Sequence, residues 1–185
     1  MKRVRKPVSK LSPIEKTRDW VESFVVGLNL CPFAKKELVN DLIRFRLTNA
    51  RTDIDLLVEL KEELELLQGN LSIETTLLIH PSVLNDFAEY NQFLGHADQL
   101  LITLNLEGVF QIASFHPDYQ FVDTDPDDAE NYTNRSPFPM LHLLREESLE
   151  KAIEHYDDVD LIPARNIAKM NEIGVAGLNA LQKGE

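Results

Sequence analysis

The stretch NYTNRSPFPMLHLLRE, residues 131–146, decides how this chain is interpreted. Ser136 is a good helix N-cap, and Pro137 suits a first helical position because the amide it lacks would have no helical partner there. The residues that follow are apolar at nearly every position, and further on the pattern becomes amphipathic. The sequence therefore predicts a helix from Pro137 to about Tyr156 whose first half is buried on all sides.

Polar side chains are expected within this buried half of the helix. His142, Arg145 and Glu146 fall on the stripe that faces inward. Burying such groups is costly unless they are paired, hydrogen-bonded or bound to a ligand. Because His142 and Glu146 are separated by one helical turn, both could also reach one metal ion. The stretch therefore indicates a functional site.

The composition is that of a soluble globular protein. The chain has 185 residues, of which 43% are hydrophobic and 27% are charged. Its net charge of −12 argues against a nucleic-acid partner, since phosphate binding requires a basic face. No apolar run would span a membrane and no signal peptide is evident, so we expect a cytoplasmic protein with no membrane partner. Residues 1–10 are basic and are expected to be a flexible arm preceding a single domain, residues 11–185.

Helix and strand signals alternate along this domain. Capping boxes at Ser12 and Thr52 each predict the start of a helix. Strands are expected within residues 42–50, 72–81 and 109–117, with helices between them. The sequence thus predicts an α/β fold with a small, mostly parallel sheet of at least three strands and helices packed on both faces. The turn before the third strand would also suit an antiparallel partner, so the direction of that strand stays open.

Histidines follow two of the expected strands. His80 and His116 each precede a proline at a strand end, and ligands in open α/β sheets collect beyond the carboxyl ends of strands. Together with His142 and Glu146 they could bind zinc or iron with one coordination position open, and such an ion could activate water or dioxygen. The alternative is that each imidazole hydrogen-bonds to nearby backbone, which we favour for His80.

Cys31 is the only cysteine, so neither an internal disulfide nor a Cys-only zinc site can form. It follows the first helix, where a helix C-terminus would raise its pKa, but Pro32 could begin a new turn whose amides lower that pKa. As a nucleophile it would need a base, and His116 and His142 are the candidates. A buried, inert thiol is the alternative.

Two arginines are candidates for holding an anionic ligand. Arg135 precedes the expected helix start, where backbone amides attract anions, and Arg145 lies on the inward stripe. Asn134 and Tyr119 could orient a carboxylate or phosphate held there. Alternatively, both arginines pair with acidic residues of the protein.

The chain resembles a bacterial family known only as domain of unknown function fourteen-fifteen. The resemblance rests on VVGLNLCPFA (25–34), FHPDYQF (115–121) and NYTNRSPFPMLHLLRE (131–146), with IPARNI (162–167) as a weaker fourth stretch. It spans nearly the whole chain after the basic arm. Because the family has no established activity or cofactor, the resemblance implies only that these segments form one unit.

These patterns predict a small-molecule enzyme, a metal-dependent hydrolase or oxidoreductase acting on an anionic metabolite. His116, His142 and Glu146 would form its reactive centre with a divalent metal as cofactor. Two alternatives are left open: a metal-free anion-binding or regulatory module, and a thiol-dependent enzyme that uses Cys31.

Overall fold

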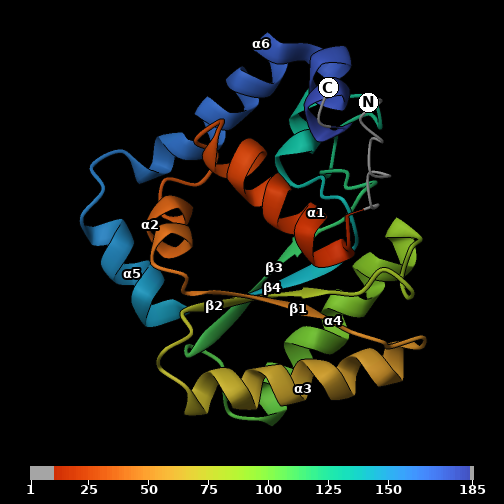
Figure 1. The fold of residues 1–185 in the computed structure, drawn as a ribbon, viewed down its shortest axis with the longest axis vertical. Coiled ribbons are helices and arrows are strands. Elements are labelled where there is room, and N and C mark those ends of the chain that lie inside the picture. The colour runs from red at the N-terminus through yellow and green to blue at the C-terminus, as the bar shows by residue number, and fades with distance from the viewer. Residues whose placement is uncertain (1–10, 184–185) are drawn as a thin grey trace, which may run out of the picture.

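The computed structural model describes residues 11–183, so the basic arm expected at residues 1–10 lies outside the described part of the chain. Figure 1 shows a central sheet surrounded by helices. Within the described range no helix is both long and apolar enough to cross a bilayer. The elements, in chain order, are α1 (Pro13–Trp20), η1 (Val21–Val26), α2 (Ala34–Val39), β1 (Ile43–Leu47), α3 (Asp53–Gly69), β2 (Thr75–Ile79), α4 (Phe87–Thr103), β3 (Phe110–Phe115), η2 (Ala129–Thr133), β4 (Met140–Arg145), α5 (Glu146–Glu154), η3 (Val159–Leu161) and α6 (Ile162–Lys183).

Local sequence signals determine where α1 and α3 begin. The Ser12 hydroxyl accepts the Glu15 amide, and the Glu15 carboxylate accepts the Ser12 amide in return. Thr52 and Asp55 form the same reciprocal pair before α3. Each pair satisfies two amides that the first turn of a helix leaves without a partner. Both predicted capping boxes are confirmed.

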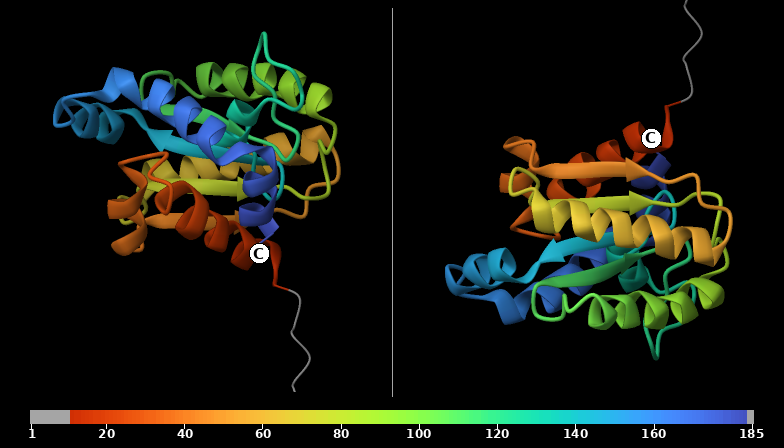
Figure 2. Two further views of the ribbon diagram at one scale, coloured as in Figure 1. Left: turned by 90° about the horizontal axis from the view of Figure 1, so that it is seen from above. Right: turned by 90° about the horizontal axis from the view of Figure 1, so that it is seen from below.

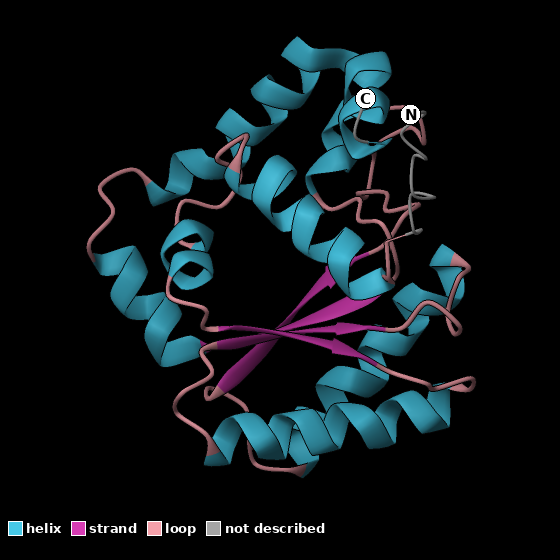
Figure 3. Ribbon diagram, viewed as in Figure 1, coloured by secondary structure: helices cyan, strands magenta, loops and turns pink. Residues whose placement is uncertain are grey.

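The four strands form one mixed sheet in the order β1-β2-β4-β3. β1 and β2 are parallel, whereas β4 is antiparallel to both of its neighbours, as the arrows in Figure 3 show. β3 consequently points in the same direction as β1 and β2. The α/β class is confirmed, but the prediction of a mostly parallel sheet was wrong, because an unpredicted strand separates β2 from β3.

That strand, β4, occupies residues for which a helix was predicted. Met140 to Arg145 pair with β2 on one side and β3 on the other, and only α5, from Glu146 onward, is helical. A central strand covered on both faces has a continuous apolar pattern, which periodicity alone cannot distinguish from a buried helix. Pro139 also disfavours helical backbone at Phe138. The helix prediction was therefore wrong as far as Arg145 and right for α5.

Helices cover both faces of the sheet, as expected (Figure 2). α3 and α4 pack on the face that carries Leu78, Leu141 and Leu143. α1, η1, η2 and α6 pack on the opposite face, against Leu77 and Met140. Because side chains alternate along a strand, the even-numbered positions of β4 share this second face. His142 therefore points towards the α1 side of the sheet.

Candidate functional site

His142 lies in the middle of the sheet. It is opposite Leu77 of β2 and Ala113 of β3 in the strand register. On the α1 side its ring is next to Phe115, with the ring centroids 6.1 Å apart. Burial lowers the pKa of His142 to about 4, because charging an imidazole inside the fold costs desolvation free energy. The imidazole is therefore neutral at pH 7.

The hydrogen bonds of Thr75 identify which nitrogen of His142 carries the proton. The Thr75 hydroxyl lies 2.6 Å from the Leu143 carbonyl oxygen and 2.7 Å from Nε2 of His142. A hydroxyl has one proton and a carbonyl can only accept, so Thr75 donates to Leu143 and accepts from Nε2–H. The neutral ring then has its lone pair on Nδ1. Among residues 11–183 no hydrogen bond involves this nitrogen.

A pocket of about 280 Å³ has His142 on its wall. It lies between the sheet and the helices α1, η1, α2 and α5, and its surface is mostly apolar. Figure 1 shows α2 and α5 at the end of the sheet where β1 and β2 begin. We expected a site at the other end, where parallel strands finish. The apolar walls are formed by Trp20, Val21, Val25, Phe33, Ala34, Ile43, Leu77, Ala113, Phe115, Leu144, Leu149 and Ala152.

One wall of the pocket is built by an unusual helical segment. η1 continues α1 with π-helical bonds, in which the Gly27 amide donates to Glu22 and the Leu30 amide to Val25. π-helical turns are rare in proteins and are frequent at functional sites. Here the wider turn places Val21 and Val25 on the pocket wall.

Cys31 lines the same pocket as His142. Burial raises the pKa of the Cys31 thiol, while the backbone amides of Phe33 and Ala34, near the start of α2, lower it. Burial is the larger of the two effects, so the thiol is protonated at neutral pH. Phe33 also contacts Tyr156 beyond α5, with ring centroids 5.7 Å apart, which joins the two helices beside the pocket.

Two carboxylates contribute polar atoms to the pocket wall. Burial raises the pKa of Glu37, the nearby Lys36 lowers it, and the charge of Glu74 raises it. One carboxylate oxygen of Glu74, Oε1, is buried and has no hydrogen-bond partner within the described range. The same holds for the indole nitrogen of Trp20. The pocket thus combines apolar walls with a few polar side chains.

The residues expected to bind a metal do not converge. β4 begins at Met140, opposite Phe115, so His116 lies beyond one end of this strand and Glu146 beyond the other. In extended backbone His142 and Glu146 are about 13 Å apart, whereas on a helix both would have reached one ion. Across residues 11–183 no group of three or more His, Cys, Asp or Glu side chains is arranged to hold a metal ion.

His116 is part of a different, aromatic cluster on the α4 side of the sheet. Its Nε2 bonds to the Leu84 carbonyl oxygen at 3.2 Å, and its Nδ1 accepts the Asp118 amide at 3.0 Å. Its ring packs against Tyr90 and Phe87. Burial lowers the pKa of His116. Both ring nitrogens are used by the backbone, so this histidine fixes the loop after β3.

His80 occupies the core beside the same cluster. Its Nδ1 donates to the Val83 carbonyl oxygen at 3.0 Å and its ring stacks on Tyr90. Burial lowers the pKa of His80 to about 4. Its Nε2 has no partner among the described residues and is enclosed by protein. The backbone bond that we favoured for His80 is confirmed.

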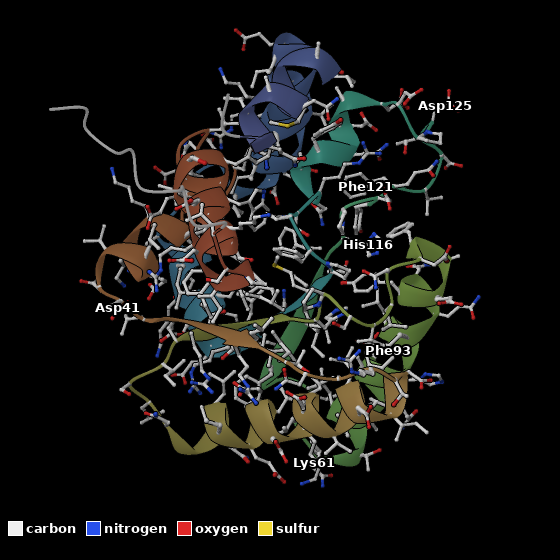
Figure 4. The ribbon with its side chains drawn as sticks, turned by 45° about the vertical axis from the view of Figure 1, so that its right-hand side comes forward. Asp41, Lys61, Phe93, His116, Phe121 and Asp125 are labelled. Atoms are coloured by element: carbon white, nitrogen blue, oxygen red, sulfur yellow. The ribbon has the colours of Figure 1, made fainter. Side chains whose placement is uncertain are left out.

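This cluster lies on the α4 side of the sheet, whereas the pocket lies on the α1 side, towards the end where β1 and β2 begin. In Figure 4, His116 lies beside the loop that carries Phe121 and Asp125. Asp41, which follows α2, lies on the other side of the same view. His116 does not line the pocket and both of its ring nitrogens bond to backbone groups, so it is not the base that could activate Cys31.

The residues expected to hold an anion stabilise a loop instead. Arg135 donates to the carbonyl oxygens of Tyr119 and Pro126, at 3.2 and 2.6 Å, and stacks over Tyr132. The Asn134 side chain donates to the Ser114 carbonyl oxygen. These bonds hold the segment between β3 and β4 against the sheet. The expected pairing of Arg135 with acidic side chains is also absent from the described residues, since its partners are carbonyl groups.

Arg145 closes the C-terminal end of α3. Its guanidinium donates to the carbonyl oxygens of Leu67, Asn70 and Ile73 and lies over the Phe110 ring. The last carbonyl groups of a helix lack partners and carry partial negative charge, which a guanidinium neutralises well. Although Arg145 borders the pocket, its donors are directed at backbone oxygens.

Sequence reasoning missed several groups of the pocket. In the sequence, Trp20 and Thr75 match the patterns of core and strand residues. No local pattern indicates that Glu37 and Glu74 line the same pocket as His142. Cys31, by contrast, was a predicted candidate, because Pro32 could begin a turn whose amides lower the pKa of the thiol. The pocket residues come from segments far apart in the sequence, so their meeting depends on the order of the strands.

The fold and the site together define a mixed α/β protein with a mostly apolar pocket beside a partly buried, neutral histidine. The chain belongs to the family described as protein of unknown function (DUF1415), which matches residues 12–180. The resemblance seen in the sequence is thereby confirmed. No curated protein and no solved structure shows significant similarity to the chain.

Proposed function

We propose that the protein binds a small, mostly apolar molecule that donates a hydrogen bond to His142. The observation that carries this proposal is the Nδ1 lone pair of His142, which has no partner among the described residues and belongs to a wall of an apolar pocket. Nδ1 is not one of the side-chain atoms that are both buried and unpaired, so it is open to the pocket and accessible to a ligand. A ligand N–H or O–H would satisfy it, while the apolar walls bury the rest of the molecule.

The proposal requires no metal. The hydrolase or oxidoreductase reaction expected from the sequence would use His116, His142 and Glu146 as one centre, and these residues lie apart in the fold. A cytoplasmic location and the absence of a nucleic-acid partner are kept in the proposal. The net charge of −12 supports the second of these.

Indole tests this proposal, because it combines an apolar body with a single N–H donor. Its isostere benzofuran has the same shape without the donor. We expect isothermal titration calorimetry to show binding of indole and at least tenfold weaker binding of benzofuran, since His142 would be left unpaired. Equal affinity of the two molecules, or no binding of either, would contradict the proposal.

Two substitutions separate the two nitrogens of His142. In His142→Gln the amide nitrogen takes the place of Nε2 and keeps the bond to Thr75, but no acceptor stands at Nδ1. In His142→Asn the amide oxygen takes the place of Nδ1 and the donor to Thr75 is lost. We expect the glutamine variant to lose the preference for indole over benzofuran and the asparagine variant to retain part of it.

A second candidate function is a thiol-dependent enzyme with Cys31 as nucleophile. It is supported by the location of Cys31 and His142 on one pocket and by the backbone amides of Phe33 and Ala34, which lower the pKa of the thiol. Burial acts against it, because it favours the thiol over the thiolate. The rate of alkylation by iodoacetamide as a function of pH distinguishes a buried thiol from a reactive thiolate. Burial predicts an inflection above the ordinary pKa of a cysteine, and an inflection near neutral pH would establish a reactive thiolate instead.

A further inference from the structure

Three side chains of the pocket wall offer hydrogen-bond acceptors. Nδ1 of His142 carries a lone pair, and Oε1 of Glu74 is buried with no partner within residues 11–183. Glu37 adds a second carboxylate, close enough to Glu74 for the two charges to interact. The wall also carries donors, among them the Trp20 indole N–H, which is buried and has no partner among the described residues. An occupant of this pocket therefore meets acceptors and negative charge.

The cations near the pocket have other partners. The Arg145 guanidinium donates to three backbone carbonyl oxygens. Lys36 contacts Glu37 at 3.8 Å, but 80% of the lysine side chain is exposed, so solvent weakens this pair. Lys151 is paired with Glu147 on the outer side of α5. The charge of Lys151 also acts on Glu74, but both lysines are exposed, so solvent weakens their effect on the two carboxylates.

We infer that the ligand of this pocket is a small apolar amine, whose ammonium group is held by Glu74 and Glu37 and whose hydrocarbon body lies against the apolar walls. The inference rests on the proposed ligand-binding function of the same pocket and specifies its ligand class. An ammonium group has three N–H donors and a positive charge, so it satisfies several acceptors at once. One of its protons can also reach Nδ1 of His142.

The same charges disfavour the anionic metabolite that the sequence suggested. A carboxylate or phosphate in this pocket would lie beside two carboxylates and opposite an acceptor nitrogen. Like charges at short range inside a protein repel strongly because the medium screens them poorly. The two arginines that prompted the anionic expectation, Arg135 and Arg145, are bound to backbone oxygens.

Three matched probes test the ligand class: 3-phenylpropylamine, 3-phenylpropanol and 3-phenylpropanoate. They share one hydrocarbon body and differ in charge and in hydrogen-bonding capacity. Trp20 is the only tryptophan of the chain and lines the pocket, so its fluorescence, excited where the probes do not absorb, reports occupancy. We expect the amine to bind at least tenfold more tightly than the alcohol, and the carboxylate to bind more weakly than either.

Substitutions of the carboxylates test which groups hold the amine. Glu74→Gln and Glu37→Gln should each weaken amine binding about tenfold or more and change alcohol binding by less than threefold, because only the charged probe loses its partner. Glu89→Gln, on the exposed first turn of α4, removes the same formal charge away from the pocket and should leave both affinities unchanged. Thermal unfolding of each variant confirms that it is folded, and the two pocket variants serve as independent tests.

The outcomes separate this inference from the proposed function. Binding of the alcohol and of indole without any preference for the amine would overturn the amine inference and leave the binding function standing. Tight binding of the carboxylate probe would also overturn the inference. If neither indole nor any of the three probes binds, the proposed function itself fails.

Discussion

At the scale of single residues, His80, His116 and His142 differ in how their ring nitrogens are used. His116 has both nitrogens bonded to backbone groups, and this fixes a loop. His80 uses one nitrogen, and the other is enclosed by protein. His142 uses Nε2 to contact Thr75 and keeps Nδ1 on the pocket side of the sheet. Only His142 therefore combines an unused acceptor with space for a ligand.

The depressed pKa of His142 predicts a loss of stability in acid. Its folded pKa of about 4 lies below the unfolded value of about 6.5, so the unfolded chain takes up the proton first as the pH falls. The stability that the neutral ring contributes is thus complete above pH 6.5 and is lost between pH 6.5 and 4. We expect this one group to account for about 3 kcal/mol of the loss.

Urea unfolding at pH 7 and pH 4 measures this effect. In His142→Gln the difference in unfolding free energy between the two pH values should shrink by that amount, because glutamine does not titrate. His96 is exposed, so His96→Gln is the matched control and should behave as the wild type. An unchanged pH dependence in His142→Gln would show that the folded protein tolerates a charged ring at this position.

At the scale of elements, the π-helical segment η1 shapes the pocket wall and depends on Gly27. A Cβ atom at Gly27 would lie 2.0 Å from the Ser23 carbonyl oxygen, so the backbone must shift to accept any side chain. We expect Gly27→Ala to destabilise the protein by about 1–3 kcal/mol, as overpacking does. Chemical denaturation measures the change.

Gly95 provides the matched control for this substitution. It lies within α4, and a Cβ there would meet nothing within 4 Å. Gly95→Ala should therefore stabilise the protein by roughly 0.5–1 kcal/mol through helix propensity alone. Equal effects of the two substitutions would mean that η1 can relax without cost.

Sequence reasoning succeeded for elements defined by local chemistry. The capping boxes at Ser12 and Thr52 place two helix starts correctly, because a cap involves residues three positions apart. β4 was missed because its burial comes from β2 and β3, far away in the sequence, and produces the same apolar run as a buried helix.

The candidate site was predictable only in part, because some of its signals are local in the sequence and others depend on the order of the strands. His142 attracted attention as a polar residue within an apolar run, and it does lie on the pocket. Its partners were misassigned, because a helix would have paired it with Glu146 whereas the strand pairs it with Thr75. The contributions of Glu37 and Glu74 depend on the strand order, which local patterns do not specify.

At the scale of the whole molecule, the inserted antiparallel strand explains where the pocket lies. β4 enters between β2 and β3 and leads directly into α5 at the end of the sheet where β1 begins. α5 and α2 then border a space above the sheet that α1 and η1 close from the other side. The sequence-based expectation of a site beyond the strand ends at His80 and His116 corresponds to the opposite end, which aromatic packing fills.

The central claim is that Nδ1 of His142 is an unprotonated acceptor available to a ligand in the pocket. A two-bond ¹H–¹⁵N correlation spectrum of the ¹⁵N-labelled protein at pH 7 observes the imidazole nitrogens directly, and the His142→Gln variant assigns the His142 signals. The account predicts a proton on Nε2, an unprotonated Nδ1, and a shift of the Nδ1 resonance when indole is added. A proton on Nδ1, or an Nδ1 resonance that does not move at high indole concentration, would contradict it.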